Sequence, residues 1–261
     1  GRGQGEGSTP HALHDGREEL MSQLVMVRHG QASFFADDYD KLSERGEDQA
    51  RVLAKFWLER GQDFDEVYCG TLKRQHRTAE VAGEVFRAAG RPWPEIVQRP
   101  ALNEYDADNI MDNLLPELCA RNDEFITLKS EYDNACEGRE RYRTFHRLLE
   151  AVMAVYVEGD YTSNGFEPWP VFSGRVRSAL DSIMNVPGGG RRIAVFSSGG
   201  PIGISVQTAL RAPDIKACEL NWRIYNCSLT EFTFSGTKRV ALDSFNSVAH
   251  LLPHPELLTF R

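Results

Sequence analysis

Three short apolar runs, each followed by a polar turn, mark candidate strands along the chain. Residues 24–27 (Leu-Val-Met-Val) and 193–196 (Ile-Ala-Val-Phe) are uninterrupted, and a less regular run covers 64–68. A strand that is apolar at every position is typically buried on both faces, as in a parallel sheet. These runs therefore predict central strands, with a weaker strand at 96–102, where Pro100 interrupts the pattern.

Between the runs, apolar residues recur at helical spacing. A helix is predicted between Ser43, a favourable N-cap, and Gly61, and a second helix ends before Pro92. Further helices are predicted over 168–184 and from about Pro201, where proline suits a helix start. Strand-like residues from 229 to 245 predict a terminal hairpin, antiparallel at the sheet edge. Strands alternating with helices predict an α/β three-layer sandwich, with a mostly parallel sheet and helices on both faces.

Residues 106–165 lack a strand pattern and predict a helical insertion. Within them, apolar residues from 145 to 156 form one helical stripe, which is more typical of a core than of a functional site. Residues 1–20 are rich in glycine and charge and lack the apolar segment of a signal peptide, which favours a flexible tail. The expected organisation is a tail over 1–20 and a single domain over 21–261.

Composition narrows the possible partners and compartment. The chain has 261 residues, 41% of them hydrophobic, and a net charge of -8, which disfavours nucleic acid or an anionic membrane as the main partner. No apolar run approaches the roughly eighteen residues of a membrane span. Five cysteines without CxxC spacing indicate a reducing compartment, and we expect a cytoplasmic protein. An edge strand near the C-terminus could support a homodimer.

The strongest chemical signal is the segment Arg28-His29-Gly30-Gln31, directly after the first predicted strand. Open α/β sheets bind ligands at the carboxyl ends of their strands. Neutral imidazole is a competent nucleophile toward phosphorus, arginine offers a planar fork of donors to phosphate oxygens, and glycine leaves room for an incoming group. By itself, such a tripeptide is also compatible with an ordinary surface loop.

Further segments in the same order strengthen this signal. They are Leu42-Ser43-Glu44-Arg45-Gly46, Gly70-Thr71-Leu72-Lys73-Arg74-Gln75-His76-Arg77-Thr78-Ala79 and Leu102-Asn103-Glu104. Together with Arg28-His29-Gly30, they resemble the histidine phosphatase (phosphoglycerate mutase-like) superfamily. Its motifs are Arg-His-Gly, Leu-Ser/Thr-x-x-Gly, Ser-Pro-Leu-x-Arg-Ala-x-Gln-Thr-Ala and Leu-x-Glu. The resemblance covers roughly residues 24–251 and is weakest in the helical insertion.

The resemblance implies a role for each matched residue. His29 would attack phosphorus and form a phosphohistidine, Arg28 and Arg74 would neutralise the phosphoryl oxygens, and Glu104 would protonate the leaving group. Its carboxyl pKa would have to be raised for that role. Gln31, Ser198 and Gly199 are further candidates for phosphate binding. Neither a metal nor another cofactor is expected, because the arginines neutralise the charge.

One position departs from the family pattern. The family has a second histidine in a Ser-His-Gly motif after a buried strand, and this chain has Ser198 there. A serine hydroxyl donates one neutral hydrogen bond and supplies no cationic charge. Backbone N–H groups at the helix start near Gly200 could partly replace that histidine by holding an anion. His76 and His250 are weaker candidates to replace it.

A second departure concerns the subclass. Mutases of the family usually have asparagine six residues after the nucleophile, and this chain has Phe35. Phe34, Phe35 and Tyr39 suggest an apolar pocket mouth, although they could equally pack the loop. The leading hypothesis is a metal-independent phosphatase acting on a small phosphomonoester. The alternatives are a phosphoester-binding protein with weakened catalysis and a phosphoglycerate-mutase-type phosphotransferase.

Overall fold

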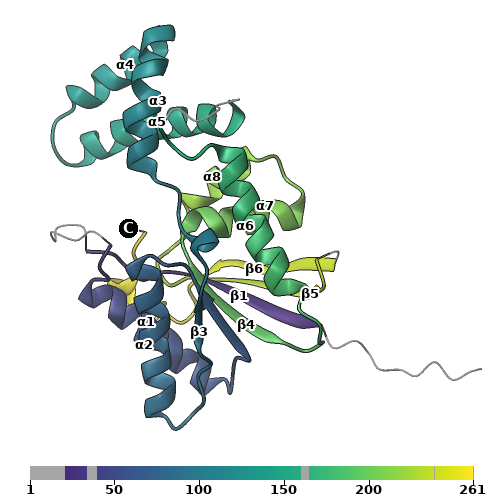
Figure 1. Ribbon diagram of the computed structural model, residues 1–261. Coiled ribbons are helices and arrows are strands. Elements are labelled where there is room, and N and C mark those ends of the chain that lie inside the picture. The colour runs from purple at the N-terminus through teal and green to yellow at the C-terminus, as the bar shows by residue number, and fades with distance from the viewer. Residues whose placement is uncertain (1–20, 34–39, 160–164, 238, 261) are drawn as a thin grey trace, which may run out of the picture.

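In the part of the chain that the structure describes, six strands form one mixed sheet between two layers of helices (Figure 1). The computed structural model describes residues 21–33, 40–159, 165–237 and 239–260. The proposed tail over 1–20 and the aromatic residues at 34, 35 and 39 lie outside these ranges. Across the sheet the order is β3 (Ile96–Gln98), β2 (Glu66–Cys69), β4 (Arg192–Ser197), β1 (Ser22–Arg28), β5 (Leu229–Ser235) and β6 (Arg239–Ser247).

The strand directions agree with the predicted α/β class. Strands β3, β2, β4 and β1 are mutually parallel, whereas β5 and β6 are antiparallel to their neighbours. Arg28 is opposite Ser197 at the carboxyl ends of the central pair. The strand expected over 96–102 is shorter, because the chain turns into a 3₁₀ helix, η1 (Pro100–Leu102). Pro100 favours this turn because its ring fixes φ and its nitrogen cannot donate to a sheet.

Helices cover both faces of the sheet. Helices α1 (Glu44–Glu59) and α2 (Lys73–Ala88) pack on one face, and α6 (Trp169–Met184) and α7 (Gly199–Leu210) pack on the other (Figure 1). Alternate side chains of β1 pack on opposite faces of the sheet. Val25 and Val27 belong to the core beneath α1 and α2, while Leu24 and Met26 belong to the core beneath α6 and α7. This arrangement confirms the three-layer sandwich.

The region expected to be a helical insertion contains α3 (Ala107–Arg121), α4 (Asp123–Asp133) and α5 (Arg139–Glu158). These helices lie beyond the carboxyl end of β1 (Figure 1). Their buried side chains, such as Ile110 and Val152, join the core cluster that contains Leu24 and Met26. Helix α8 (Ile215–Asn221) and a last 3₁₀ turn, η2 (Pro255–Leu257), complete the structure. Within the described ranges, no helix combines the length and apolarity of a membrane span.

Candidate active site

A cavity of about 580 Å³ opens beside His29, where β1 ends. It brings together four residues that the sequence predicted as catalytic and that lie up to 76 positions apart: Arg28, His29, Arg74 and Glu104. The remaining described lining comes from the loops and helices around them: Ala32, Leu72, Tyr105, Asp106, Ala107, Asp108, Met111, Phe145, Leu149, Asn221, Trp222, Asn226 and Phe260.

The imidazole of His29 is buried, and its hydrogen bonds define its protonation. Its Nδ1 lies 2.7 Å from the carbonyl oxygen of Gly30, which can only accept, so Nδ1 carries the proton. The Nε–H of Arg74 donates to Nε2 at 3.2 Å. Burial first, and then the charges of Arg74 and Arg28, hold the pKa of His29 well below its usual value. The ring is therefore neutral near pH 7, with its lone pair on Nε2.

The two arginines are held by acceptors on different parts of the chain. Arg74 pairs through Nη1 with Asp40 at 2.6 Å, and the same carboxylate accepts from the backbone N–H of Lys73 at 2.7 Å. Arg28 donates through Nη1 to the carbonyl oxygen of Ile224. These contacts orient both guanidinium groups beside the imidazole and reduce the side-chain entropy lost when an anion binds.

Glu104 is fixed by the start of α7. The backbone N–H of Gly200 lies 3.1 Å and 3.0 Å from its two carboxyl oxygens. A Cβ on Gly200 would come within 2.0 Å of Oε1, so glycine is required for this approach. Burial raises the pKa of Glu104, while the Gly200 N–H and the nearby arginines oppose that shift. The N–H group of Gly200, which was expected to hold an anion in place of the missing histidine, binds the carboxyl group of Glu104.

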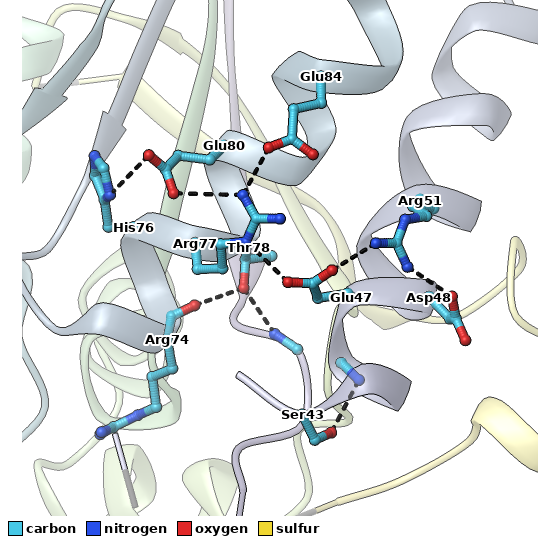
Figure 2. A network of polar contacts seen from close by, with 12 residues as sticks. Ser43, Glu47, Asp48, Arg51, Arg74, His76, Arg77, Thr78, Glu80 and Glu84 are labelled. Atoms are coloured by element: carbon cyan, nitrogen blue, oxygen red, sulfur yellow. Dashed lines mark hydrogen bonds and ion pairs between the residues drawn. The ribbon is translucent and has the colours of Figure 1, made fainter. Parts of the chain in front are cut away.

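Buried polar residues connect the loop that contains His29 and Gly30 to its surroundings. The hydroxyl of Thr78 accepts from the N–H of Gly30 at 3.0 Å and donates to the carbonyl of Arg74 at 2.6 Å (Figure 2). On the other side, the side-chain amide of Asn226 donates to the carbonyl of His29 at 3.1 Å. The backbone around His29 is thus held by α2 and by the segment before β5.

Three predicted phosphate-binding residues do not line the cavity. The side-chain oxygen of Gln31 accepts from the Ser43 hydroxyl at 3.3 Å, which directs it toward the start of α1. Ser198 is fully buried and accepts from the amide of Gln75 at 2.7 Å. Gly199 packs so tightly that a Cβ there would lie 1.7 Å from the side-chain oxygen of Asn221. None of the three belongs to the described cavity lining, and their role in phosphate binding stays a prediction.

The two histidines considered as replacements also lie outside the cavity lining. His76 is 3.6 Å from Glu80 on the exposed side of α2 (Figure 2). His250 is buried beside Phe56 of α1, with ring centroids 5.5 Å apart, and burial lowers its pKa to about 4. Neither ring therefore supplies imidazolium charge to the described cavity.

Several lining residues carried no functional signal in the sequence. Phe145 and Leu149 belong to the helical stripe that was expected to be core, yet they also line the cavity. Trp222, Asn226 and Phe260 lie in irregular segments without a motif. Only the packing of the insertion and the C-terminal segment against the strand ends brings them to the site.

Comparison with known proteins gives a consistent result. The model of the histidine phosphatase superfamily (branch 1) matches residues 24–164 and 153–247. A 2,3-bisphosphoglycerate-dependent phosphoglycerate mutase of Corynebacterium glutamicum is 29% identical over 119 residues, which are 42% of this chain. The match spans 47% of that mutase, about half its length.

Solved structures share the fold over most of the chain. A phosphoglycerate mutase from Bacillus anthracis has a TM-score of 0.57 at 16% identity, covering 89% of this chain and 96% of that chain. A mycobacterial glucosyl-3-phosphoglycerate phosphatase has a TM-score of 0.57 at 20% identity, covering 86% and 98%. At these identities the similarity establishes the fold alone, and the reaction has to be inferred from the residues of the site.

Proposed function

This chain belongs to the histidine phosphatase superfamily, and from that premise we propose that it is a metal-independent phosphatase that hydrolyses a small phosphomonoester through a phosphohistidine at His29. The observation that carries the proposal is the state of that imidazole. Its Nδ1 proton is held by Gly30, and its Nε2 lone pair lies in a cavity wall beside two arginines. A neutral, oriented imidazole is the form that attacks phosphorus.

In the first step, Arg74 transfers its Nε–H hydrogen bond from His29 Nε2 to a phosphoryl oxygen, which frees the lone pair. Nε2 then attacks the phosphorus atom, and the bond from phosphorus to the ester oxygen breaks. Glu104 donates its proton to the departing oxygen and becomes a carboxylate. Its buried position, which raises the pKa, favours the protonated starting form. Arg28 and Arg74 neutralise the phosphoryl oxygens as charge shifts during transfer.

In the second step, water attacks phosphorus, and the bond from phosphorus to Nε2 breaks. Glu104 takes a proton from that water, which restores its acid form, and inorganic phosphate leaves. His29 returns to its neutral state with Nδ1 still bound to Gly30. Each turnover therefore consumes one ester and one water and requires no group beyond the side chains of the cavity.

The first test is hydrolysis of phenyl phosphate in the presence of a chelator. We expect turnover by the wild type and a loss of at least about a thousandfold in His29→Ala, because the nucleophile is removed. His254→Ala is the matched control, since that histidine is exposed and lies outside the cavity lining. Rapid quenching should trap phosphate on the protein in a form stable to base and labile to acid.

The role of Glu104 is tested by varying the leaving group. Glu104→Gln should slow phenyl phosphate by about 10²–10⁴-fold and 4-nitrophenyl phosphate much less, because nitrophenolate leaves without a proton. Wild-type kcat/KM for phenyl phosphate should fall on the alkaline side as Glu104 ionises, at a pH above that of an ordinary glutamate, since its pKa is raised. Equal losses for both esters would contradict the general-acid role.

The two alternatives give distinct outcomes in the same assays. A phosphoester-binding protein would bind vanadate or phosphate yet release no phosphate from any ester. A mutase would pass the phosphoryl group from His29 to a hydroxyl of phosphoglycerate in preference to water. Ser198 lies outside the described cavity lining, so Arg28 and Arg74 are the cationic groups in that lining. This is compatible with the alternative of a phosphoester-binding protein with weakened catalysis.

A further inference from the structure

The cavity that contains His29 is much larger than a phosphate group, and its remaining walls differ in character from the catalytic end. Met111 of α3 and Phe145 and Leu149 of α5 face it, together with Trp222 and Phe260. Leu149 is buried, Phe260 is exposed, and the other three side chains are partly buried. Apolar side chains left partly uncovered at a cavity gain from contact with an apolar ligand.

The charges around the cavity are distributed unevenly. The cationic side chains in its described lining, Arg28 and Arg74, both adjoin the imidazole of His29. Two further carboxylates, Asp106 and Asp108, lie at the start of α3 and are exposed. Asp106 caps that helix by accepting from Asn109 N–H at 3.0 Å, which fixes its side chain at the cavity edge.

The amides of the lining are already engaged. Asn221 donates to the hydroxyl of Tyr105 at 2.8 Å, and Asn226 donates to the carbonyl of His29. Among the described lining residues, a second anionic group on a substrate would therefore meet carboxylates and apolar side chains. The cationic lining residues, Arg28 and Arg74, both lie beside His29.

We propose that the substrate is a phosphomonoester whose leaving alcohol has an aromatic or alkyl body and no further negative charge. This inference rests on the proposed function and assigns specificity to two features of the cavity. The apolar side chains of α3, α5 and Trp222 hold the body of the alcohol. Asp106 and Asp108 disfavour a carboxylate or a second phosphate, because like charges repel and an unpaired anion loses its hydration on binding.

The test uses three aryl phosphates of nearly equal shape whose substituents are insulated from the ring by methylene groups. They are 4-(carbamoylmethyl)phenyl phosphate, 4-(carboxymethyl)phenyl phosphate and 4-(2-aminoethyl)phenyl phosphate. We expect kcat/KM to be at least tenfold higher for the neutral ester than for the carboxylate ester, with the cationic ester close to or above the neutral one. A carboxylate ester that reacts as fast as the neutral one overturns the proposal.

Single substitutions test which carboxylates cause the preference for the neutral ester. Asp108→Asn should reduce the preference for the neutral over the carboxylate ester by about threefold or more, because one repelling charge is removed. Asp112→Asn is the matched control, since Asp112 is exposed on the same helix and is not part of the cavity lining. If both variants change the preference equally, the discrimination comes from overall charge, and the assignment to the cavity edge is wrong.

The apolar contact is tested in parallel. Phe145→Ala should lower kcat/KM for 2-naphthyl phosphate at least fivefold more than for phenyl phosphate, mainly through KM. Tyr142→Ala, on the exposed side of α5 and outside this cavity, should leave that ratio unchanged. An unchanged ratio in Phe145→Ala overturns the apolar assignment. Failure of the proposed function looks different, because then none of the esters is hydrolysed and His29 is never phosphorylated.

Discussion

At the scale of single residues, Ser198, where the family resemblance predicts a histidine, lies in a compact polar arrangement. Gln75 donates to the Ser198 hydroxyl at 2.7 Å and to the carbonyl of Leu102 at 3.2 Å, and both Gln75 and Ser198 are fully buried. Gly70 completes the fit, because a Cβ there would come within 1.8 Å of the side-chain oxygen of Gln75. The family motif has serine where this chain has Gly70, and alanine where it has Gln75. The larger side chain at position 75 is therefore found together with small residues at positions 70 and 198.

This packing predicts the outcome of restoring the histidine. Ser198→His alone should lower activity and cost about 1–3 kcal/mol of unfolding free energy, because the imidazole would overlap the Gln75 amide. The double variant Ser198→His/Gln75→Ala should recover stability and equal or exceed wild-type activity. Urea unfolding and phenyl phosphate kinetics measure the two effects. A single Ser198→His variant as stable as the wild type would show that Gln75 does not fill this space.

At the scale of elements, the starts of α1 and α2 position the loop that contains His29. The first turn of α1 lies against the backbone after His29, so closely that a Cβ on Gly46 would be 2.3 Å from the carbonyl oxygen of Gln31. Ion pairs tie the two helices together, with Glu47 of α1 bound to Arg77 of α2 at 2.9 Å (Figure 2). Backbone contact and side-chain pairing therefore act together to place His29 relative to Arg74.

A pair of glycine substitutions tests this close approach. Gly46→Ala should destabilise the protein by about 1–3 kcal/mol and lower kcat, because the new methyl group must displace the loop that contains His29, the proposed nucleophile. Gly174→Ala in α6 has open space at its Cβ and should instead stabilise by about 0.5–1 kcal/mol through helix propensity, with unchanged kcat. Equal stability changes in the two variants would contradict the tight contact.

At the scale of the whole molecule, one core cluster extends from the sheet into the helices above it. It includes Met26 of β1, Val176 of α6 and Val152 of α5. The walls of the cavity therefore depend on the packing that also supports the sheet. Substitutions deep in α5 should alter both stability and substrate affinity, in contrast to changes on its exposed side.

The stability of the whole chain should also depend on pH through His250. Its pKa is about 4 in the folded protein, whereas an exposed histidine titrates near 6.5. As the pH falls below about 6.5, the unfolded chain takes up a proton that the folded chain does not bind until about pH 4. Stability is therefore lost on acidification over this window, by about 2 kcal/mol between pH 7 and pH 5.

Urea unfolding at the two pH values measures this effect. His250→Gln should lose about 2 kcal/mol less than the wild type on going from pH 7 to pH 5, because glutamine does not titrate. His254→Gln is the control, since that side chain is exposed and should behave like the wild type. An identical loss in wild type and His250→Gln would show that other groups account for the acid sensitivity.

The sequence by itself determined the features that depend on local periodicity and on motifs. Consecutive apolar residues at 24–27 indicate a strand buried on both faces, and helical spacing after Ser43 indicates an amphipathic helix. The alternation of such strands and helices along the chain predicted the three-layer fold. The proposed catalytic set of Arg28, His29, Arg74 and Glu104 was also predicted, because the motifs that contain these residues resemble those of the histidine phosphatase superfamily.

Only the tertiary structure decided which surfaces face the reacting group. It placed Gln31 and Ser198 outside the cavity lining and brought Phe145, Trp222 and Phe260 to it. The physical reason is that these positions depend on packing between different segments of the chain, as in the contact of Ser198 with Gln75, 123 positions away. A local pattern specifies which face of a helix is apolar, and the same apolar face serves equally well as core or as the wall of a binding cavity.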